Sequence, residues 1–184
     1  MADAALRRGL TRAVLGVFSI SMGIRQATAN DLSSMWDIFR SIISAGDALP
    51  FSEQFTRETF QSHWFGSHTA YVAVIGADVL GMYKLGANYP DSGNHVASAT
   101  YLVRPVAQGS GVGTALVQHS LAQARKEGFM AMQFNYVVSS NRAAVELYKR
   151  FGFFIAGTLP KAFRHKQLGH VDAYVMYRFL ESET

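Results

Sequence analysis

Three glycines stand at alternate positions, Gly109, Gly111 and Gly113, between an apolar segment and a long helical pattern. Glycine has no Cβ, so a ligand can approach its backbone closely, and it adopts positive φ angles that other residues avoid. The amides of residues 109–114 stand at the expected start of the helix, where the helix dipole attracts negative charge. The spacing therefore predicts a cradle of backbone N–H groups for a diphosphate. A glycine-rich turn without a ligand is the alternative.

Two other phosphate-binding patterns do not fit this segment. A P-loop needs a lysine and then Ser or Thr after its last glycine, whereas Thr114 follows Gly113 directly. The dinucleotide-binding fingerprint needs glycine at its first, third and sixth positions. The sixth position here is Thr114 or Leu116, depending on the glycine from which counting starts. A diphosphate cradle at a helix start is the pattern that remains.

Three polar side chains after the glycines could also take part in chemistry, and each has a structural alternative. Tyr148 could donate a proton from its phenol, but its spacing from Ala144 and Leu147 is also that of a buried helical stripe. Asn141 could cap the helix that follows it or bind a ligand with its amide. Asn135 interrupts the apolar strand MQFNYVV. A polar amide lowers strand propensity there, so we expect it to satisfy neighbouring backbone groups or to face a bound acceptor.

The elements that must position these residues follow from hydrophobic periodicity and turn residues. The predicted order is strand, two helices, three strands, helix, strand, helix and two strands, which is a mixed α/β fold with a partly antiparallel sheet. Asn30 or Asp31 is expected to cap the first helix and Thr56 the second. Gly76 marks a hairpin turn. The expected strands are 23–28, 69–76, 79–87, 95–103, 129–138, 153–159 and 170–180, the expected helices are 29–44, 56–65, the segment from the glycines to about 128, and 141–151, and a polar loop is expected at 160–169.

Composition limits the class of protein. The 184 residues are 49% hydrophobic and 16% charged, which fits one domain at 22–184 behind a flexible or targeting-like extension at 1–21. The first 21 residues hold three arginines against one aspartate, so they carry +2 of the net charge of +4. The remaining +2 is weak for a nucleic-acid protein, and no apolar run is long enough to cross a membrane. The absence of cysteine excludes disulfides and thiolate zinc sites and agrees with a cytoplasmic location; no metal is expected.

Two segments carry a resemblance to a known family. The sequence QGSGVG, from Gln108 to Gly113, resembles the acyl-CoA-binding motif of the GNAT superfamily of N-acetyltransferases and fills every position of it. The segment NRAAVELYKRFGF is similar to a second signature of that family, matched at Asn141, Ala144, Leu147, Tyr148, Gly152 and Phe153. The resemblance covers residues 22 to about 180. The tail looks like a bacterial and fungal subgroup of small-amine acetyltransferases, which includes a fungal enzyme that detoxifies a proline analogue.

The resemblance implies a GNAT fold, in which a mostly antiparallel sheet is splayed between two parallel strands and flanked by helices. It implies acetyl-CoA as cosubstrate and direct attack on the thioester by the amine of a small molecule or an amino acid. Tyr148 would then protonate the leaving thiolate, and Asn135 would help to hold the acceptor. The residues expected to bind acetyl-CoA are Tyr101, Leu102, Val103, Gln108, Gly109, Ser110, Gly111, Val112, Gly113, Thr114 and Asn141.

Several choices stay open at this point. Relatives are often dimers, so a homodimer is expected. Acetylation of protein N-termini or lysines, and acyl-CoA sensing without catalysis, are the alternative functions. A carboxylate-bearing acceptor is favoured if the basic loop at 160–169 lines the site; otherwise that loop is solvated or forms a subunit contact. The proton acceptor is a water relay or one of Glu53, Glu58, His63 and Asp172. Three aromatic residues either pack in the core or line the acceptor pocket: Phe51, Phe55 and Trp64.

Overall fold

The computed structural model describes residues 21–180. The predicted order of strands and longer helices is confirmed. The elements are β1 (Gly23–Gln26), η1 (Ala29–Asp31), α2 (Leu32–Ala45), α3 (Arg57–Phe65), β2 (Thr69–Ile75), β3 (Asp78–Ala87), η2 (Asp91–Gly93), β4 (Val96–Val103), η3 (Pro105–Ala107), α4 (Val112–Lys126), β5 (Ala131–Val138), α5 (Arg142–Arg150), β6 (Phe154–His165) and β7 (Gly169–Phe179). The predicted extension at 1–21 lies, apart from Ser21, outside the described residues. That boundary and the homodimer stay predictions.

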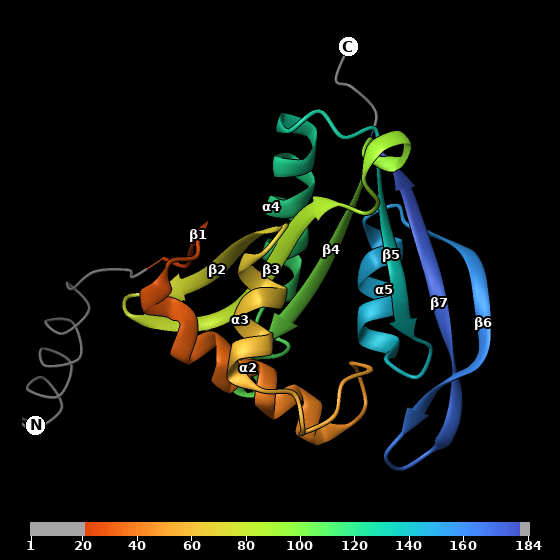
Figure 1. The fold of residues 1–184 in the computed structure, drawn as a ribbon, viewed down its shortest axis with the longest axis horizontal. Helices are drawn as coiled ribbons and strands as arrows, with labels where there is room; N and C mark the ends of the chain where they lie inside the picture. Colours follow the sequence, from red (N-terminus) through yellow and green to blue (C-terminus); the bar gives the residue numbers. More distant parts are fainter. Residues whose placement is uncertain (1–20, 181–184) are drawn as a thin grey trace, which may run out of the picture.

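The seven strands form one sheet in the order β1-β2-β3-β4-β5-β7-β6. Every neighbouring pair is antiparallel except β4 and β5. These two strands pair over three residues, from Val96 opposite Ala131 to Ser98 opposite Gln133, and then separate. Figure 1 shows them diverging from the end of the sheet at which they meet. The predicted mixed sheet, splayed between two parallel strands, is confirmed.

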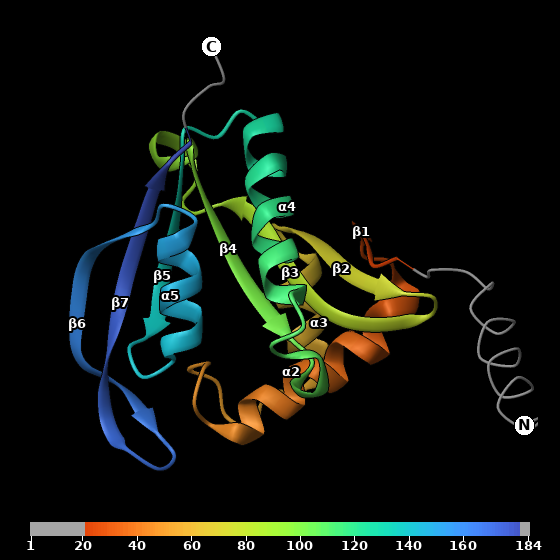
Figure 2. The same ribbon diagram turned by 180° about the vertical axis from the view of Figure 1, so that it is seen from behind.

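Helices cover both faces of the sheet. α4 and α5 lie on one face, and α2 and α3 lie on the other (Figures 1 and 2). Under α4 and α5, the buried side chains of Leu116, Val117 and Leu121 recur at helical spacing and face the strands. Under α2 and α3, a second cluster is built around Phe39, Phe60 and other apolar residues. Each fully buried large side chain contributes about 1.5–3 kcal/mol to stability, so both clusters fix the helices that border the splayed strands.

The first helical segment begins at Ala29, as predicted, but its first turn is a 3-10 turn. Residues 29–31 form the 3-10 turn η1, and Asp31 does not cap α2 with its side chain. The Asp31 carboxylate reaches back to accept the N–H of Thr28 at 2.8 Å, and it pairs with Arg25 at 2.7 Å. Asp31 holds the N-cap position of α2, but the predicted side-chain cap is absent, because the 3-10 turn precedes α2 and the Asp31 carboxylate binds Thr28 instead. The cap at Thr56 is confirmed, since its hydroxyl oxygen accepts the N–H of Thr59 at 3.2 Å.

The predicted loop at 160–169 is a turn at 166–168 and is wrong for 160–165, because β6 continues to His165. The strand crosses Pro160 through an irregularity in its pairing with β7. There Lys161 has a φ of 52°, and its N–H donates to Asp172 Oδ1 at 2.8 Å. Tyr136 of β5 donates its hydroxyl to the carbonyl oxygen of Ala162 at 2.6 Å. Because β6 is the edge strand, a proline can stand at this bulge without removing an inner ladder bond.

Candidate active site

The glycine segment forms a cradle at the start of α4. Gly109 and Gly111 have φ angles of 77° and 89°, which favour glycine. The Ser110 hydroxyl donates to the carbonyl oxygen of Ala107 at 2.6 Å and holds the turn. Five unpaired N–H groups gather at the N-terminus of a helix of 15 residues, where the helix dipole adds to their attraction for an anion. The amides that donate to no described residue are those of Gly109, Gly111, Val112, Gly113 and Thr114.

The edge of β4 is open where β5 has separated from it. The N–H of Arg104 donates to the carbonyl oxygen of Leu80 at 2.8 Å, in continuation of the β3–β4 ladder. Since backbone directions alternate along a strand, the even-numbered residues of β4 face β3 and the odd-numbered ones face β5. The backbone of Leu102 therefore pairs with β3. The N–H and C=O groups of Tyr101 and Val103 point into the gap, where a ligand can bind them.

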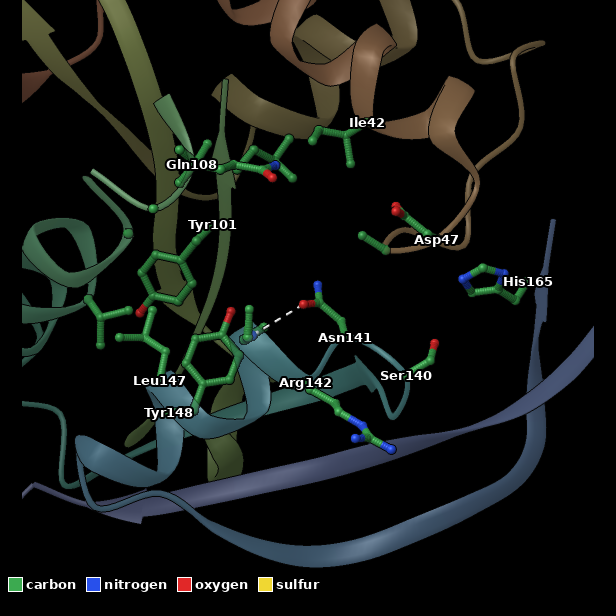
Figure 3. Close-up of a pocket in the computed structure, with 18 residues that line it drawn as sticks. Ile42, Asp47, Tyr101, Gln108, Ser140, Asn141, Arg142, Leu147, Tyr148 and His165 are labelled. Carbon is green, nitrogen blue, oxygen red and sulfur yellow. Dashed lines mark hydrogen bonds between the residues drawn. The ribbon is translucent and has the colours of Figure 1, made fainter. Parts of the chain in front are cut away.

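A cavity of about 580 Å³ lies between the cradle, the open edge of β4 and the start of α5 (Figure 3). Asp47 after α2 and His165 of β6 close its far side. Ser110, Gly111, Val112 and Thr114 belong to the cradle but lie outside the lining of this cavity. The predicted acetyl-CoA residues that the structure brings together in the lining are Tyr101, Leu102, Val103, Gln108, Gly109, Gly113 and Asn141.

A second cavity, of about 420 Å³, adjoins the first between β3, β4, β5 and α3. The two share part of their lining, including Tyr101, Leu102, Asn141 and Tyr148. A thioester held in the first cavity would therefore meet a molecule in the second beside Tyr148. This junction lies where the parallel strands part, at the place that the sequence predicts for the chemistry.

The structure shows the packing role predicted for Tyr148, and its role as an acid stays a prediction. Its ring packs against Phe134, with ring centroids 4.5 Å apart, and near Tyr101 at 5.9 Å. Its hydroxyl has no hydrogen-bond partner among the described residues, and Figure 3 shows it pointing into the cavity. Burial raises the pKa of Tyr148 above its ordinary value, so the phenol keeps its proton at neutral pH. The ring packs in the core, and the hydroxyl faces the junction without a partner among the described residues.

Asn141 also has two roles open to it. Its Oδ1 accepts the N–H of Ala144 at 3.2 Å, so it caps α5 as one alternative predicted. Figure 3 shows the amide nitrogen directed away from that bond and into the cavity. Beside it, the Ser140 Oγ is buried without a partner among the described residues and lines the same cavity. Asn141 and Ser140 are thus polar groups with capacity left for a ligand.

Asn135 lines the second cavity at an irregularity in β5. The β5–β7 register shifts between Phe134 and Val137, and such a bulge re-aims the side chains within it. The Asn135 amide bonds to side chains rather than to backbone: its nitrogen donates to Asn88 Oδ1 at 2.6 Å, and its Oδ1 accepts from Gln133 at 2.6 Å. The predicted alternative, in which the Asn135 side chain hydrogen-bonds to neighbouring backbone groups, is therefore wrong. The acceptor role stays a prediction.

Of the four proton-acceptor candidates, His63 lines the second cavity. Glu53 accepts a hydrogen bond from Ser44, Glu58 is exposed in the first turn of α3, and Asp172 binds the N–H of Lys161. Burial, together with the nearby positive charge, lowers the pKa of His63 to about 4. The imidazole is therefore neutral at physiological pH.

The sequence did not predict Lys84 or His68, which line the second cavity beside His63. Lys84 is buried on β3, and burial lowers its pKa to about 8. Burial, with the charge of Lys84, also lowers the pKa of His68. The single lysine within the apolar strand VLGMYKLGA could have indicated this site, because lysine is seldom fully buried unless it is paired.

The other predicted wall residues divide between the cavities and the core. Phe51 lines the second cavity, whereas Trp64 is buried and Phe55 packs against Phe39 at 5.1 Å between ring centroids. Of the basic residues at 160–169, His165 reaches the first cavity. Within residues 21–180, no group of three or more His, Asp or Glu side chains could hold a metal ion, and no helix has the length and apolar content to cross a bilayer.

Comparison with known proteins agrees with this geometry. Residues 33–153 match the model of the acetyltransferase (GNAT) family. A GCN5-related N-acetyltransferase from Kribbella flavida is 39% identical, with 86% of this chain and 97% of that chain covered and a TM-score of 0.83. A phosphinothricin acetyltransferase from Sinorhizobium meliloti, solved in complex with acetyl-CoA, shares the fold at 21% identity, with 86% and 88% covered and a TM-score of 0.77.

Curated relatives match to differing extents. The L-methionine sulfoximine/L-methionine sulfone acetyltransferase of Pseudomonas aeruginosa is 28% identical over 150 residues, which are 77% of this chain and 86% of the relative. Other matches are shorter and span 37% of a Drosophila melanogaster relative and 13% of a Saccharomyces cerevisiae relative. The family match and the Kribbella flavida relative show that the chain belongs to the GNAT family and is an N-acetyltransferase.

Proposed function

We propose that the chain transfers the acetyl group of acetyl-CoA to the primary or secondary amine of a small molecule, by direct attack of the amine on the thioester. The observation that carries this proposal is the meeting of two cavities at Tyr148, one reaching the unpaired amides of α4 and the other lined by polar side chains of β3 and β5. A thioester and an amine that enter from opposite sides come together there.

The first cavity fits an acyl-CoA in three respects. The five unpaired amides at the start of α4 suit the diphosphate. The outward-facing backbone groups of Tyr101 and Val103 suit the amides of the pantetheine arm, which would run along β4 as an added strand. The free amide nitrogen of Asn141 and the unpaired hydroxyl of Ser140 offer further hydrogen bonds. The Sinorhizobium meliloti relative, which holds acetyl-CoA, has the same fold.

The residues at the junction supply the two groups that acetyl transfer needs. The thioester provides an acetyl group on a good leaving group, the thiolate of CoA. The N–H of Tyr101 or Val103 can hold the negative charge that develops on the carbonyl oxygen, and the Tyr148 hydroxyl can give its proton to the departing sulfur. The chain contains no cysteine, so a thiol of the protein does not carry the acetyl group.

The second cavity favours an amine in its reactive form. Three basic side chains, Lys84, His63 and His68, line it. The charge of Lys84 lowers the pKa of a nearby ammonium ion, so the acceptor amine loses its proton more readily there than in water. A volume of about 420 Å³ suits a small molecule. The Pseudomonas aeruginosa relative, named for acetylation of small amino-acid derivatives, supports the same class of acceptor.

A screen of amines, amino acids and short peptides with acetyl-CoA, analysed by mass spectrometry, tests the proposal. We expect acetylated small molecules, and CoA release that rises with the acceptor. A thiol reagent detects CoA without background, because the protein has no thiol of its own. Products confined to peptides would assign the chain to protein acetylation instead. Tight acetyl-CoA binding with no acceleration by any amine would mean an acyl-CoA sensor.

A further inference from the structure

Lys84 is a buried cation to which the proposed transfer reaction assigns no direct contact with the substrate. It lies on β3 opposite Thr100 of β4, and it is 7% exposed. Its Nζ contacts His63 Nε2 at 2.9 Å, donates to the carbonyl oxygen of His63 at 3.0 Å, and lies 5.9 Å from the ring centroid of Trp64. An ammonium has three donors, so one N–H remains for another partner.

Lys84 lacks a counter-charge. No carboxylate of residues 21–180 forms an ion pair with its Nζ, and His63 is neutral because its pKa is lowered to about 4. A buried charge is normally paired, since desolvation of an unpaired ion is strongly unfavourable. Burial alone lowers the pKa of Lys84 to about 8, so the side chain is still mostly cationic at neutral pH. The missing partner is an anion.

The surrounding cavity shows the same imbalance. Its lining contains Lys84, His63 and His68 but no Asp or Glu. Gly86 makes room for His68, because a Cβ at this glycine would stand 2.8 Å from the imidazole. His68 thus lies over β3 between Lys84 and the amide of Asn88. An acceptor with only positive charge would find no partner here, whereas one that brings its own carboxylate would neutralise the site.

We propose that Lys84 binds the carboxylate of the acceptor, so that the natural acceptor is an amino acid rather than a plain amine. This inference rests on the proposed acetyl transfer and adds the acceptor class to it. The carboxylate would accept the remaining N–H of the ammonium. The ring nitrogens of His68, on the same wall, contact the hydroxyls of Ser67 and Ser98 at 3.0 and 3.4 Å. Fixing the carboxylate at Lys84 leaves the amino group free to turn toward the junction at Tyr148. Lys84 is then the residue that selects the acceptor.

The test compares each L-amino acid with its methyl ester, for the wild-type protein and for Lys84→Met. The acceptor is the L-amino acid that the wild type acetylates fastest. Methionine keeps the length of the apolar stem and removes a charge whose burial without a counter-ion is unfavourable. The ester also changes the pKa of the amine, but it does so equally for both proteins. The change in the acid-to-ester ratio of kcat/KM therefore reports Lys84 alone. Lys149→Met, at an exposed ion pair with Glu146 on α5, is the matched control.

We expect Lys84→Met to lower the acid-to-ester ratio by about 30-fold or more, as for removal of one partner from a buried charge pair. The loss should fall on the KM of the acid, with the KM of acetyl-CoA unchanged, and Lys149→Met should leave the ratio alone. A ratio changed less than about threefold would show that Lys84 only ties α3 to the sheet, and the inference would be overturned.

If Lys84→Met does not fold, the acceptor preference of the wild-type protein still tests the role of Lys84. Acetylation of esters and plain amines but of no amino acid would overturn the role of Lys84 while the proposed acetyl transfer stands. Failure of the wild type to bind acetyl-CoA in calorimetry would instead reject the proposed function itself.

Discussion

Gly111→Glu tests the anion cradle directly. Gly111 is the N-cap of α4, with a φ of 89°, and no atom lies within 4 Å of a Cβ placed there. A glutamate would therefore fit without a clash and would place its carboxylate at the mouth of the cradle. Gly76, in the β2–β3 turn, has a φ of 59° and equally open space. Gly76→Glu thus imposes a similar backbone strain far from the cradle.

Two effects of the substitution can be separated by size. A residue other than glycine in the left-handed region costs about 1–2 kcal/mol of stability, which lowers Tm by roughly 2–8 °C in a chain of this length. Two unit charges about 5 Å apart repel by about 1 kcal/mol in water and about 3 kcal/mol at an effective dielectric of about 20. Against a diphosphate, we therefore expect a loss of acetyl-CoA affinity of about ten- to a hundredfold.

Calorimetric titration with acetyl-CoA and thermal denaturation measure the two effects. Gly111→Gln carries the same strain without the charge, so its affinity should lie between those of the wild type and Gly111→Glu. Gly76→Glu should lose stability but keep the wild-type affinity. The gap between the Glu and Gln variants should shrink as salt is added, because exposed charges are screened. Equal affinities for both Gly111 variants and the wild type would refute a diphosphate at this helix start.

Three further changes test other parts of the structure. Tyr148→Phe should lower kcat by about 10²–10⁴ as expected for loss of a general acid, with little change in acetyl-CoA affinity; unchanged turnover would leave Tyr148 a core residue only. Asp31→Asn concerns a carboxylate whose pKa falls to about 2 through Arg25 and Thr28. The wild type should be more stable on the order of 1–2 kcal/mol at neutral pH and lose this advantage as pH falls from about 4 to 2; urea denaturation curves that stay parallel across that range would contradict it. For Lys84, the unfolded chain binds the proton more tightly than the folded one, so wild-type stability should rise relative to Lys84→Met between about pH 8 and 10.5; a constant difference would show that the ammonium is not desolvated.

Most of the fold could be predicted from local sequence patterns, because the interactions that form these elements join residues close together in the sequence. The helical spacing of Leu116, Val117 and Leu121 is enough to predict which face of α4 meets the sheet. Thr56 and Asn141 are caps whose partners lie three residues away. Gly109 and Gly111 of the cradle adopt positive φ angles that are easy only for glycine. For each of these, the interaction and its cause lie within one turn of the chain.

The features that were missed depend on residues far apart in the sequence. β6 runs through Pro160 because Asp172 and Tyr136, on two other strands, hold the bulge in place. The backbone N–H and C=O groups of Tyr101 and Val103 are unpaired because β5 separates from β4 after three residue pairs. The second cavity brings Lys84 together with His63, which is 21 residues away. No periodicity within one segment records such contacts, whereas the lone lysine in an apolar strand marked the position without revealing its partners.

The separation of β4 from β5 after three residue pairs links the two cavities of the site. If β4 and β5 paired along their whole length, the N–H and C=O groups of Tyr101 and Val103 would be used up in the ladder, and the two cavities would have no common wall. Unpaired backbone groups at the centre of a sheet are unfavourable, so the separated strands would be a poor structure unless a ligand completes them. The buried Lys84 without a counter-ion is unfavourable for the same kind of reason. On this argument, the unpaired backbone groups and the unpaired charge lie on the two sides of one junction because each awaits a different substrate. Acetyl-CoA would bind the backbone groups of Tyr101 and Val103, and the carboxylate of the acceptor would pair with Lys84.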